Sequence, residues 1–199
     1  MREIHHRVKN NMQVIVSLLR MYSHRIDNPR LARVFDDCRD RVNAMSLIHE
    51  ALYQSSDLAE IDFGSYIKKL CSNLRQAYGT SDKGIVVTVD KCNVTLDIDQ
   101  GVAVGMVISE LVSNSFKHAF SPGTGGAVSV SLAGLKENKV ELIVRDDGKG
   151  LPDDLDILES PSLGLQLVAA TVTRELGGTI EVERNDGTQI TIRFKCKKT

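Results

Sequence analysis

Polar side chains that could hold a metal ion and a phosphate are concentrated in the segment Glu110-Leu-Val-Ser-Asn114-Ser-Phe-Lys117-His118. Residues 110, 114 and 117 are spaced four and then three apart, so on a helix they project from one face, with His118 at its edge. A carboxylate and an amide oxygen suit Mg²⁺, and Lys117 could meet phosphate as a point charge. Taken alone, the pattern also fits the solvated face of an amphipathic helix.

Two glycine-containing segments follow this one along the chain. Asp146-Asp147-Gly148-Lys149-Gly150 comes after a run typical of a strand. An aspartate at a strand end can accept a hydrogen bond from an exocyclic amine such as that of adenine, and the glycines allow close backbone approach to a ligand. Ser162-Leu163-Gly164-Leu165 precedes a predicted helix, whose first N–H groups attract phosphate. Each segment alone is a common turn, but the three in this order indicate an ATP site without a P-loop.

The elements before residue 60 are predicted to be two helices. One apolar stripe at helical spacing runs from Ile4 to Ile26, and a second runs from Leu31 to Leu52. Asn28-Pro29 separates them, because proline disfavours a helical residue before it. We therefore expect residues 1–60 to form an antiparallel helical hairpin. Two helices cannot bury both stripes alone, so a homodimer with a four-helix bundle is expected.

Residues 61–199 have the pattern of an α+β domain. The helices expected there cover residues 63–78, 100–120 and 163–176. Asp99 is the expected cap of the second helix. The expected strands cover residues 85–89, 93–96, 127–135, 139–145, 179–183 and 189–195. The last two are joined by Asn185-Asp186-Gly187, a hairpin signal. Strands beside segregated helices predict a two-layer α/β sandwich, with helices on one face of a mixed sheet.

Composition excludes several classes of function. The 199 residues include 25 Lys and Arg against 26 Asp and Glu, so net charge gives no reason to expect nucleic acid as a partner. The longest apolar stretch, near Val102–Ile108, is too short to span a bilayer, and no secretory signal pattern is present. No cysteine pair has zinc-ligand spacing. We expect a cytoplasmic protein with no membrane segment in this chain.

The three segments resemble the N box and the two glycine boxes of the Bergerat ATP-binding fold, which histidine kinases share with gyrase. Glu-Leu-Val-Ser-Asn-Ser-Phe-Lys-His-Ala-Phe and Ser-Leu-Gly-Leu-Gln-Leu-Val are similar, within that superfamily, to sensor histidine kinases related to the HWE group. Gly177-Gly178-Thr-Ile-Glu-Val and Gly187-Thr188-Gln-Ile-Thr-Ile are similar to the last strands of these kinases, so the resemblance covers essentially the whole chain.

The resemblance implies ATP and Mg²⁺ as cofactors and assigns roles to single residues. Asn114 matches the Mg²⁺-binding asparagine, and Glu110 matches the acidic or amide position one turn earlier, so these two are the implied metal ligands. The other implied nucleotide-contacting residues are Lys117 and His118 at phosphate, Asp146 and Thr188 at adenine, and Gly148, Gly150, Gly164 and Leu165 in the glycine boxes. Ser162 stands where many histidine kinases have glycine, and the lid between Leu151 and Ser162 is short.

The segment His5-His6-Arg7-Val8-Lys9-Asn10-Asn11 resembles the H-R-x-x-N phosphoacceptor box of the same subgroup. At 100° per residue, His6 points away from the apolar stripe, whereas His5 lies on its flank. A nucleophile must be reachable by a second domain, so His6 is the expected catalytic residue. Asn10 stands one turn on, as a second catalytic candidate. The acid that follows the histidine in most other histidine kinases is replaced by Arg7.

The resemblance implies a histidine kinase that autophosphorylates on His6 and passes the phosphoryl group to an aspartate of a response-regulator receiver domain. Two alternatives are a histidine phosphotransfer protein with a decayed ATP site and an anti-sigma-type serine kinase built on the same ATP fold. The intact Asn114 and Asp146 argue against the first. The hairpin with its phosphoacceptor box argues against the second.

Overall fold

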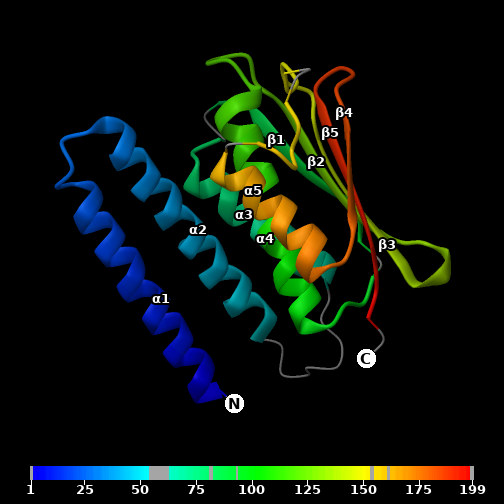
Figure 1. Cartoon of the computed structure of the whole chain (residues 1–199), viewed down its shortest axis with the longest axis horizontal. Helices are drawn as coiled ribbons and strands as arrows, with labels where there is room; N and C mark the ends of the chain where they lie inside the picture. Colours follow the sequence, from blue (N-terminus) through cyan, green and yellow to red (C-terminus); the bar gives the residue numbers. More distant parts are fainter. Residues whose placement is uncertain are drawn as a thin grey trace. The chain divides into compact units, whose positions relative to one another are not determined.

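The computed structural model describes residues 2–53, 63–80, 83–92, 94–152, 155–160 and 162–197. The chain divides into two compact units, Met1–Leu58 and Ala59–Thr199. The predicted fold class, a helical N-terminal part followed by helices and a mixed sheet, is confirmed (Figure 1). Within the described ranges, no helix has both the length and the apolar character needed to cross a membrane.

The first unit is an antiparallel pair of long helices, α1 (Arg2–Ser23) and α2 (Pro29–Tyr53). Asn28 explains where α2 begins, because its side-chain oxygen accepts a hydrogen bond from the N–H of Leu31 (3.4 Å). Pro29 is then the first helical residue, a position where its missing N–H has no consequence. The predicted hairpin and its Asn28-Pro29 turn are therefore confirmed.

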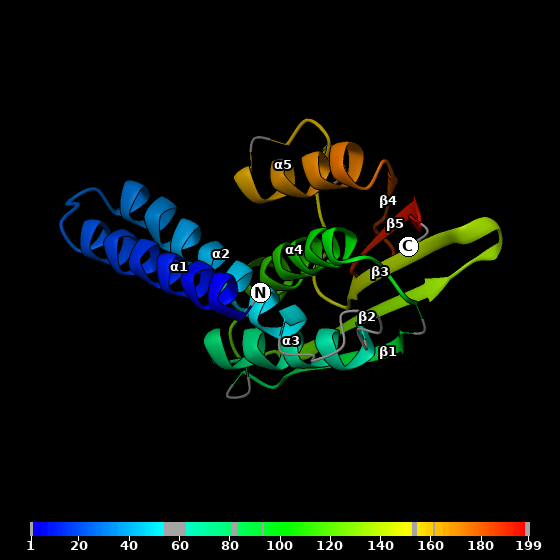
Figure 2. The ribbon, with the colours of Figure 1, turned by 90° about the horizontal axis from the view of Figure 1, so that it is seen from below.

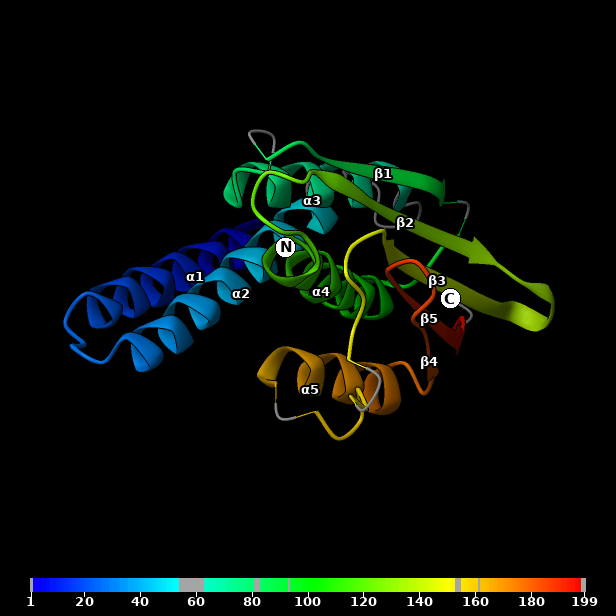
Figure 3. The ribbon, with the colours of Figure 1, turned by 90° about the horizontal axis from the view of Figure 1, so that it is seen from above.

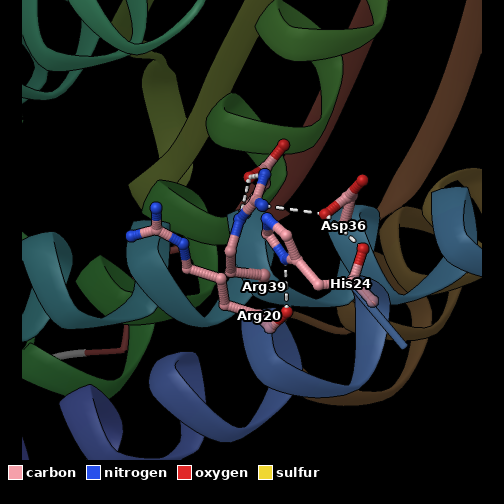
Figure 4. Close-up of polar contacts among 6 residues, drawn as sticks. Arg20, His24, Asp36 and Arg39 are labelled. Atoms are coloured by element: carbon pink, nitrogen blue, oxygen red, sulfur yellow. Dashed lines mark hydrogen bonds and ion pairs between the residues drawn. The ribbon is translucent and has the colours of Figure 1, made fainter. Parts of the chain in front are cut away.

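A polar cluster ties the two helices together near this turn (Figure 4). The hydroxyl of Ser23, the last residue of α1, donates to Asp36 of α2 (3.0 Å). Arg39 also donates to Asp36 (2.8 Å), and its guanidinium reaches Asp40 (2.8 Å). His24 Nδ1 donates to the carbonyl oxygen of Arg20 (2.8 Å), which satisfies one of the last carbonyls of α1. Among these bonds, the one from Ser23 to Asp36 joins the two helices, and Arg39 holds Asp36 in place for it.

Part of the apolar surface of the hairpin stays exposed within one chain. On α1, Val14, Ile15, Leu18, Met21 and Tyr22 are each between 41% and 58% exposed. On α2, Leu31 and Val34 are about equally exposed. Isolated exposed apolar residues are ordinary, but a continuous set on neighbouring turns marks a surface that another element covers.

The second unit contains a five-stranded sheet in the order β1-β2-β3-β5-β4. Its strands are β1 (Ile85–Cys92), β2 (Gly126–Gly134), β3 (Lys139–Asp146), β4 (Thr179–Glu183) and β5 (Thr188–Lys195). β1 and β2 are parallel, and the other neighbours are antiparallel, so the sheet is mixed as predicted. The predicted turn between the last two strands is also confirmed, with positive φ at Asp186 (52°) and Gly187 (111°).

Three helices cover one face of this sheet: α3 (Phe63–Ala77), α4 (Ile98–Asn114) and α5 (Leu163–Ala170) (Figures 2 and 3). Alternate residues of β2 and β3 point into the layer between helices and sheet, and Val128, Val130, Leu132 and Leu142 are all completely buried. On α3, burial raises the pKa of Cys71 to about 12, so this thiol is a protonated core group.

Two expectations about the start of α4 were wrong. The cap is Asp97 and not Asp99: the side chain of Asp97 accepts from the N–H of Gln100 (2.7 Å), and Asp99 already lies in the first turn. No strand forms over residues 94–96: β1 ends at Cys92, and residues 94–97 are irregular before α4 begins at Ile98. Asn93, the first residue of that predicted strand, lies outside the described residues.

The two faces of β3 provide a direct test of where the core lies. Leu142 faces the helices and is fully buried, whereas Ile143 faces the other side and is partly exposed. We expect Leu142→Ala to lower the free energy of unfolding by about 2–5 kcal/mol, since it leaves a cavity. Ile143→Ala should cost about 1 kcal/mol. Urea unfolding of both variants measures this, and equal losses would contradict the assigned core face.

Candidate functional site

The carboxylate at the end of β3 is the centre of the site. Asp146 is 5% exposed, and its Oδ1 accepts hydrogen bonds from the N–H groups of Gly148 (3.1 Å) and Thr188 (3.3 Å). Its Oδ2 accepts from the hydroxyl of Ser115 (2.8 Å). A buried carboxylate needs such donors, because it has lost the water that would otherwise solvate it. The three donors come from three separate segments, which therefore meet at Asp146.

Close backbone approach between these segments depends on two glycines. The N–H of Lys149 donates to the carbonyl oxygen of Ala119 (3.0 Å), which brings the loop after β3 against the end of the α4 region. A Cβ at Gly148 would overlap the carbonyl group and side chain of Ala119. A Cβ at Gly187 would overlap the backbone of Asp146 in the same way. Only glycine allows this packing at either position.

The end of α4 is a π-helical turn, η1 (Ser115–Ala119). Its hydrogen bonds join residues five apart, so the turn is wider than an α-helical turn and displaces the side chains that follow Asn114. His118 lines the same cavity as Asn114. Lys117 instead has its ammonium nitrogen 5.5 Å from the centre of the Tyr78 ring, a cation–π distance. Asn114 and the Lys117 ammonium therefore lie in different surroundings, one in the cavity lining and the other over Tyr78.

A cavity of about 510 Å³ opens beside Asp146, a size usual for small-molecule sites. Its lining residues come from the α4 region, the loop after β3, the start of α5 and β5: Leu111, Asn114, Ser115, His118, Ala119, Asp146, Lys149, Gly150, Leu151, Pro152, Leu155, Ser162, Leu165, Thr188 and Ile190. The cavity is mostly apolar with a few polar groups, as expected for a site that binds a flat aromatic ring next to a charged tail.

Six of the predicted nucleotide residues line this cavity: Asn114, His118, Asp146, Gly150, Leu165 and Thr188. Four others, Glu110, Lys117, Gly148 and Gly164, are outside the lining set. Gly148 still contributes, because its N–H holds Asp146. Glu110 is buried one turn before Asn114, and Gly164 is buried in the first turn of α5. The phosphate role of Lys117 and the metal role of Glu110 stay predictions.

The sequence did not indicate two parts of the cavity lining: Ser115 and the apolar residues Leu111 and Ile190. Ser115 follows directly after Asn114 and carries no signal of its own, because a serine within a helix usually returns its hydroxyl to its own backbone. Leu111 and Ile190 lie within a predicted helix and a predicted strand, and their apolar side chains do not by themselves indicate a cavity. Their share in the cavity depends on how the elements pack, which residue spacing does not show.

Arg184, which is not itself in the cavity lining, holds the backbone of two lining residues, Pro152 and Leu155. This residue follows β4, and its guanidinium donates to the carbonyl oxygens of Pro152 (3.2 Å) and Leu155 (2.7 Å). Both acceptor residues line the cavity. The described part of the short segment after Gly150 is thereby attached to the sheet by charge-assisted hydrogen bonds.

The residues present fit a Mg²⁺ ion that arrives with a nucleotide. Among the described residues, no cluster of three His, Cys, Asp or Glu side chains could hold a metal by itself. Mg²⁺ at phosphate sites commonly takes one or two protein oxygens and completes its shell with phosphate and water. Asn114 lines the cavity and offers one such oxygen, whereas Glu110 is buried one turn earlier, outside the lining.

The predicted acceptor residues lie in the first unit. His6 is within α1, but its side chain is outside the described residues. Asn10 is exposed one turn later and lines a shallow groove with Gln13, Val14, Ser17, Leu18 and Met21. Gln13 and Ser17, which helical periodicity places on the same side of α1 as His6, are exposed as expected.

Comparison with known families agrees with this arrangement of hairpin and cavity. Residues 3–78 match the family described as histidine kinase. Residues 99–198, which contain the whole cavity, match the family described as histidine kinase-, DNA gyrase B-, and HSP90-like ATPase. The chain belongs to the histidine kinase family. The predicted resemblance to kinases with this type of ATPase domain is therefore confirmed.

Individual histidine kinases are similar over most of the chain. The sensor histidine kinase PdtaS of Mycobacterium tuberculosis is 34% identical over 195 residues, which cover 96% of this chain and 38% of PdtaS. Blue-light-activated histidine kinase 2 of Erythrobacter litoralis is 30% identical over 190 residues, covering 92% of this chain and 52% of that kinase. The chain thus spans about two-fifths to one-half of the length of these relatives.

A solved structure supports the fold as well. The histidine kinase domain of a blue-light-activated histidine kinase from Erythrobacter litoralis superposes with a TM-score of 0.69 at 25% sequence identity. The match covers 92% of this chain and 95% of that domain. A hairpin followed by an ATPase-type sheet is therefore also the arrangement seen in this histidine kinase.

The close approach at Gly148 can be tested by adding one methyl group. Gly148→Ala forces the loop away from Ala119, and we expect it to lower the free energy of unfolding by about 1–3 kcal/mol. Gly134→Ala is the matched control, because its Cβ would have Val94 as its nearest neighbour, at an ordinary 3.8 Å. Urea unfolding measures both variants. Equal stability of the two would contradict the tight packing assigned to Gly148.

Proposed function

We propose that this chain is an ATP-dependent protein-histidine kinase of two-component signalling. It binds Mg·ATP in the cavity beside Asp146, phosphorylates His6, and passes the phosphoryl group to an aspartate of a response-regulator receiver domain. The observation that carries the proposal is the cavity itself: it combines a buried carboxylate with Asn114 and His118 in a chain whose hairpin has the H-R-x-x-N box. The reaction takes place in the cytoplasm, where ATP is available.

The base and the phosphates have separate proposed contacts, most of them in the cavity lining, with Glu110, Lys117 and Gly164 outside that lining. Asp146 accepts a hydrogen bond from the adenine amine, with Thr188 near the same ring edge. Gly150 and Leu165 contact the nucleotide, and the buried Gly164 allows the start of α5 to approach it closely. Asn114 and Glu110 would hold the metal ion, which would neutralise phosphate charge there. His118 and Lys117 contact the phosphates.

His6 is suited to be the acceptor because a neutral imidazole nitrogen is nucleophilic near neutral pH. Its lone pair forms a bond to the γ-phosphorus while the bond from that phosphorus to the β,γ-bridging oxygen breaks, and ADP leaves with the electron pair. The proton on the other ring nitrogen then passes to water. Asn10, exposed one turn on, positions the reacting groups. Positioning and charge neutralisation supply most of the acceleration in phosphoryl transfer.

The direct test is incubation of the whole chain with γ-³²P-labelled ATP and Mg²⁺. We expect a label that acid removes and base does not, as for a phosphohistidine. His6→Ala should abolish the label and leave ATP affinity unchanged. His5→Ala is the matched control, because it removes the neighbouring imidazole, and it should keep the label.

Other outcomes would replace the proposal. A label that persists in His6→Ala would move the acceptor to another residue. If the unmodified chain neither became labelled nor bound ATP, a histidine phosphotransfer protein with a decayed ATP site would be favoured. A base-sensitive phosphate on a partner's serine would favour a kinase of the anti-sigma type. The match of residues 3–78 to the histidine kinase family disfavours this last reading.

We also propose that the exposed apolar face of the hairpin is the contact with a second copy. Ile15, Leu18 and Tyr22 on α1 lie next to the side that packs on α2, and each is more than 40% exposed. A second hairpin would cover them, together with Leu31 and Val34, in a four-helix bundle. His6 lies on the other side of α1 by helical periodicity, so the bundle leaves it accessible.

A charge on this face should separate the dimer. Leu18→Glu places a carboxylate in the apolar contact, where burying it is costly. We expect a monomer in sedimentation equilibrium, while the unmodified chain is a dimer. Ser17→Glu adds the same charge at the adjacent, polar side of α1 and should stay dimeric. Dimers of equal stability for both variants would contradict the assigned face.

A further inference from the structure

We propose that Ser115 is a positioning residue that makes the cavity selective for purines with an exocyclic amine. The inference rests on the proposed function, that this cavity binds ATP. Ser115 does not itself need to touch the base. It acts through Asp146, whose carboxylate it holds in the orientation that accepts a hydrogen bond from the amine.

The position of Ser115 is determined by the π-helical turn that it begins. The residue lines the cavity and is 7% exposed. Its Oγ lies 2.8 Å from Asp146 Oδ2 and 3.2 Å from the carbonyl oxygen of Leu111. A hydroxyl has a single proton to donate. The shorter distance and the charge of the carboxylate favour donation to Asp146 over donation to the helix backbone.

The two oxygens of Asp146 are therefore used unequally. Oδ1 accepts from two backbone N–H groups, those of Gly148 and Thr188, which fill its two lone-pair sites. Oδ2 accepts from Ser115 and keeps one site. A ligand amine can fill this remaining site. A ligand carbonyl at the same place meets a negatively charged acceptor and finds no donor, so the cavity rejects it.

Removal of the Ser115 hydroxyl would take away the donor to Asp146 Oδ2 and leave the donors to Oδ1 in place. The backbone donors on Oδ1 remain, so Asp146 keeps its place at the end of β3. Oδ2 loses the donor that fixes it, and water can take that donor's place. Binding energy from the amine falls, whereas binding energy from the rest of the purine, the ribose and the phosphates does not.

Isothermal titration of the whole chain with two nucleotides separates these contributions. One is ATP, and the other is purine riboside 5′-triphosphate, which lacks only the amine. In Ser115→Ala we expect ATP affinity to fall roughly tenfold, as for loss of a hydrogen bond to a charged group. Affinity for the amine-free nucleotide should change by less than about twofold.

The matched control is Ser113→Ala. Ser113 is equally buried on the same helix, but its hydroxyl donates to the backbone of Glu110 and it lies outside the cavity lining. This variant should bind both nucleotides as the unmodified chain does. The ratio of the two affinities is an internal control for folding, because a poorly folded protein loses both affinities together.

Each result decides between the inference and its alternatives. Reduced preference for ATP in Ser115→Ala, with Ser113→Ala unchanged, supports the positioning role. An equal loss of both affinities, or no loss, overturns it and leaves the proposed function intact. Failure of the unmodified chain to bind ATP overturns the proposed function and this inference with it.

Discussion

The site depends on one constraint, that a carboxylate buried at the end of β3 must be surrounded by hydrogen-bond donors. Asp146 meets this requirement with donors from the end of the α4 region, the loop after β3 and the start of β5. Those segments can supply them only if their backbones come into contact, which explains the glycines at 148 and 187. The cavity is the space left beside this junction, so its shape and its charged acceptor have the same structural origin.

The hairpin is subject to a different constraint, that two helices bury only one side of each other. The hydrogen bond from Ser23 to Asp36 joins them, with Arg39 holding Asp36 in place, while apolar residues on the neighbouring side stay exposed. In the proposed dimer these residues would be buried, whereas helical periodicity places His6 on the opposite side of α1 from Ile15 and Tyr22. In the proposed function, the first unit offers the phosphoryl acceptor and the second unit the nucleotide site, as a phosphotransfer reaction requires.

Much of this was predictable from local sequence. Apolar spacing predicted the hairpin and the five strands of the sheet, the order of the three segments indicated an ATP site, and the roles of Asp146 and Asn114 came from the family resemblance. The errors arose where residue patterns allow more than one outcome, as at Asp97 and Asp99, either of which could cap a helix that begins nearby. Asp97 caps α4 in place of Asp99, and a π-helical turn brings His118 into the cavity while Lys117 lies over Tyr78. Ser115 could not be found, because its bond to Asp146 joins residues 31 positions apart.

In the proposed function, the buried Asp146 carboxylate recognises the adenine of ATP. Asp146→Asn tests it, because an amide oxygen can still accept from the backbone donors while the amide NH₂ presents a donor to the adenine amine. Isothermal titration with Mg·ATP should show affinity reduced by about tenfold or more, with the unfolding transition close to that of the unmodified chain. Unchanged affinity for ATP in this variant would contradict the account.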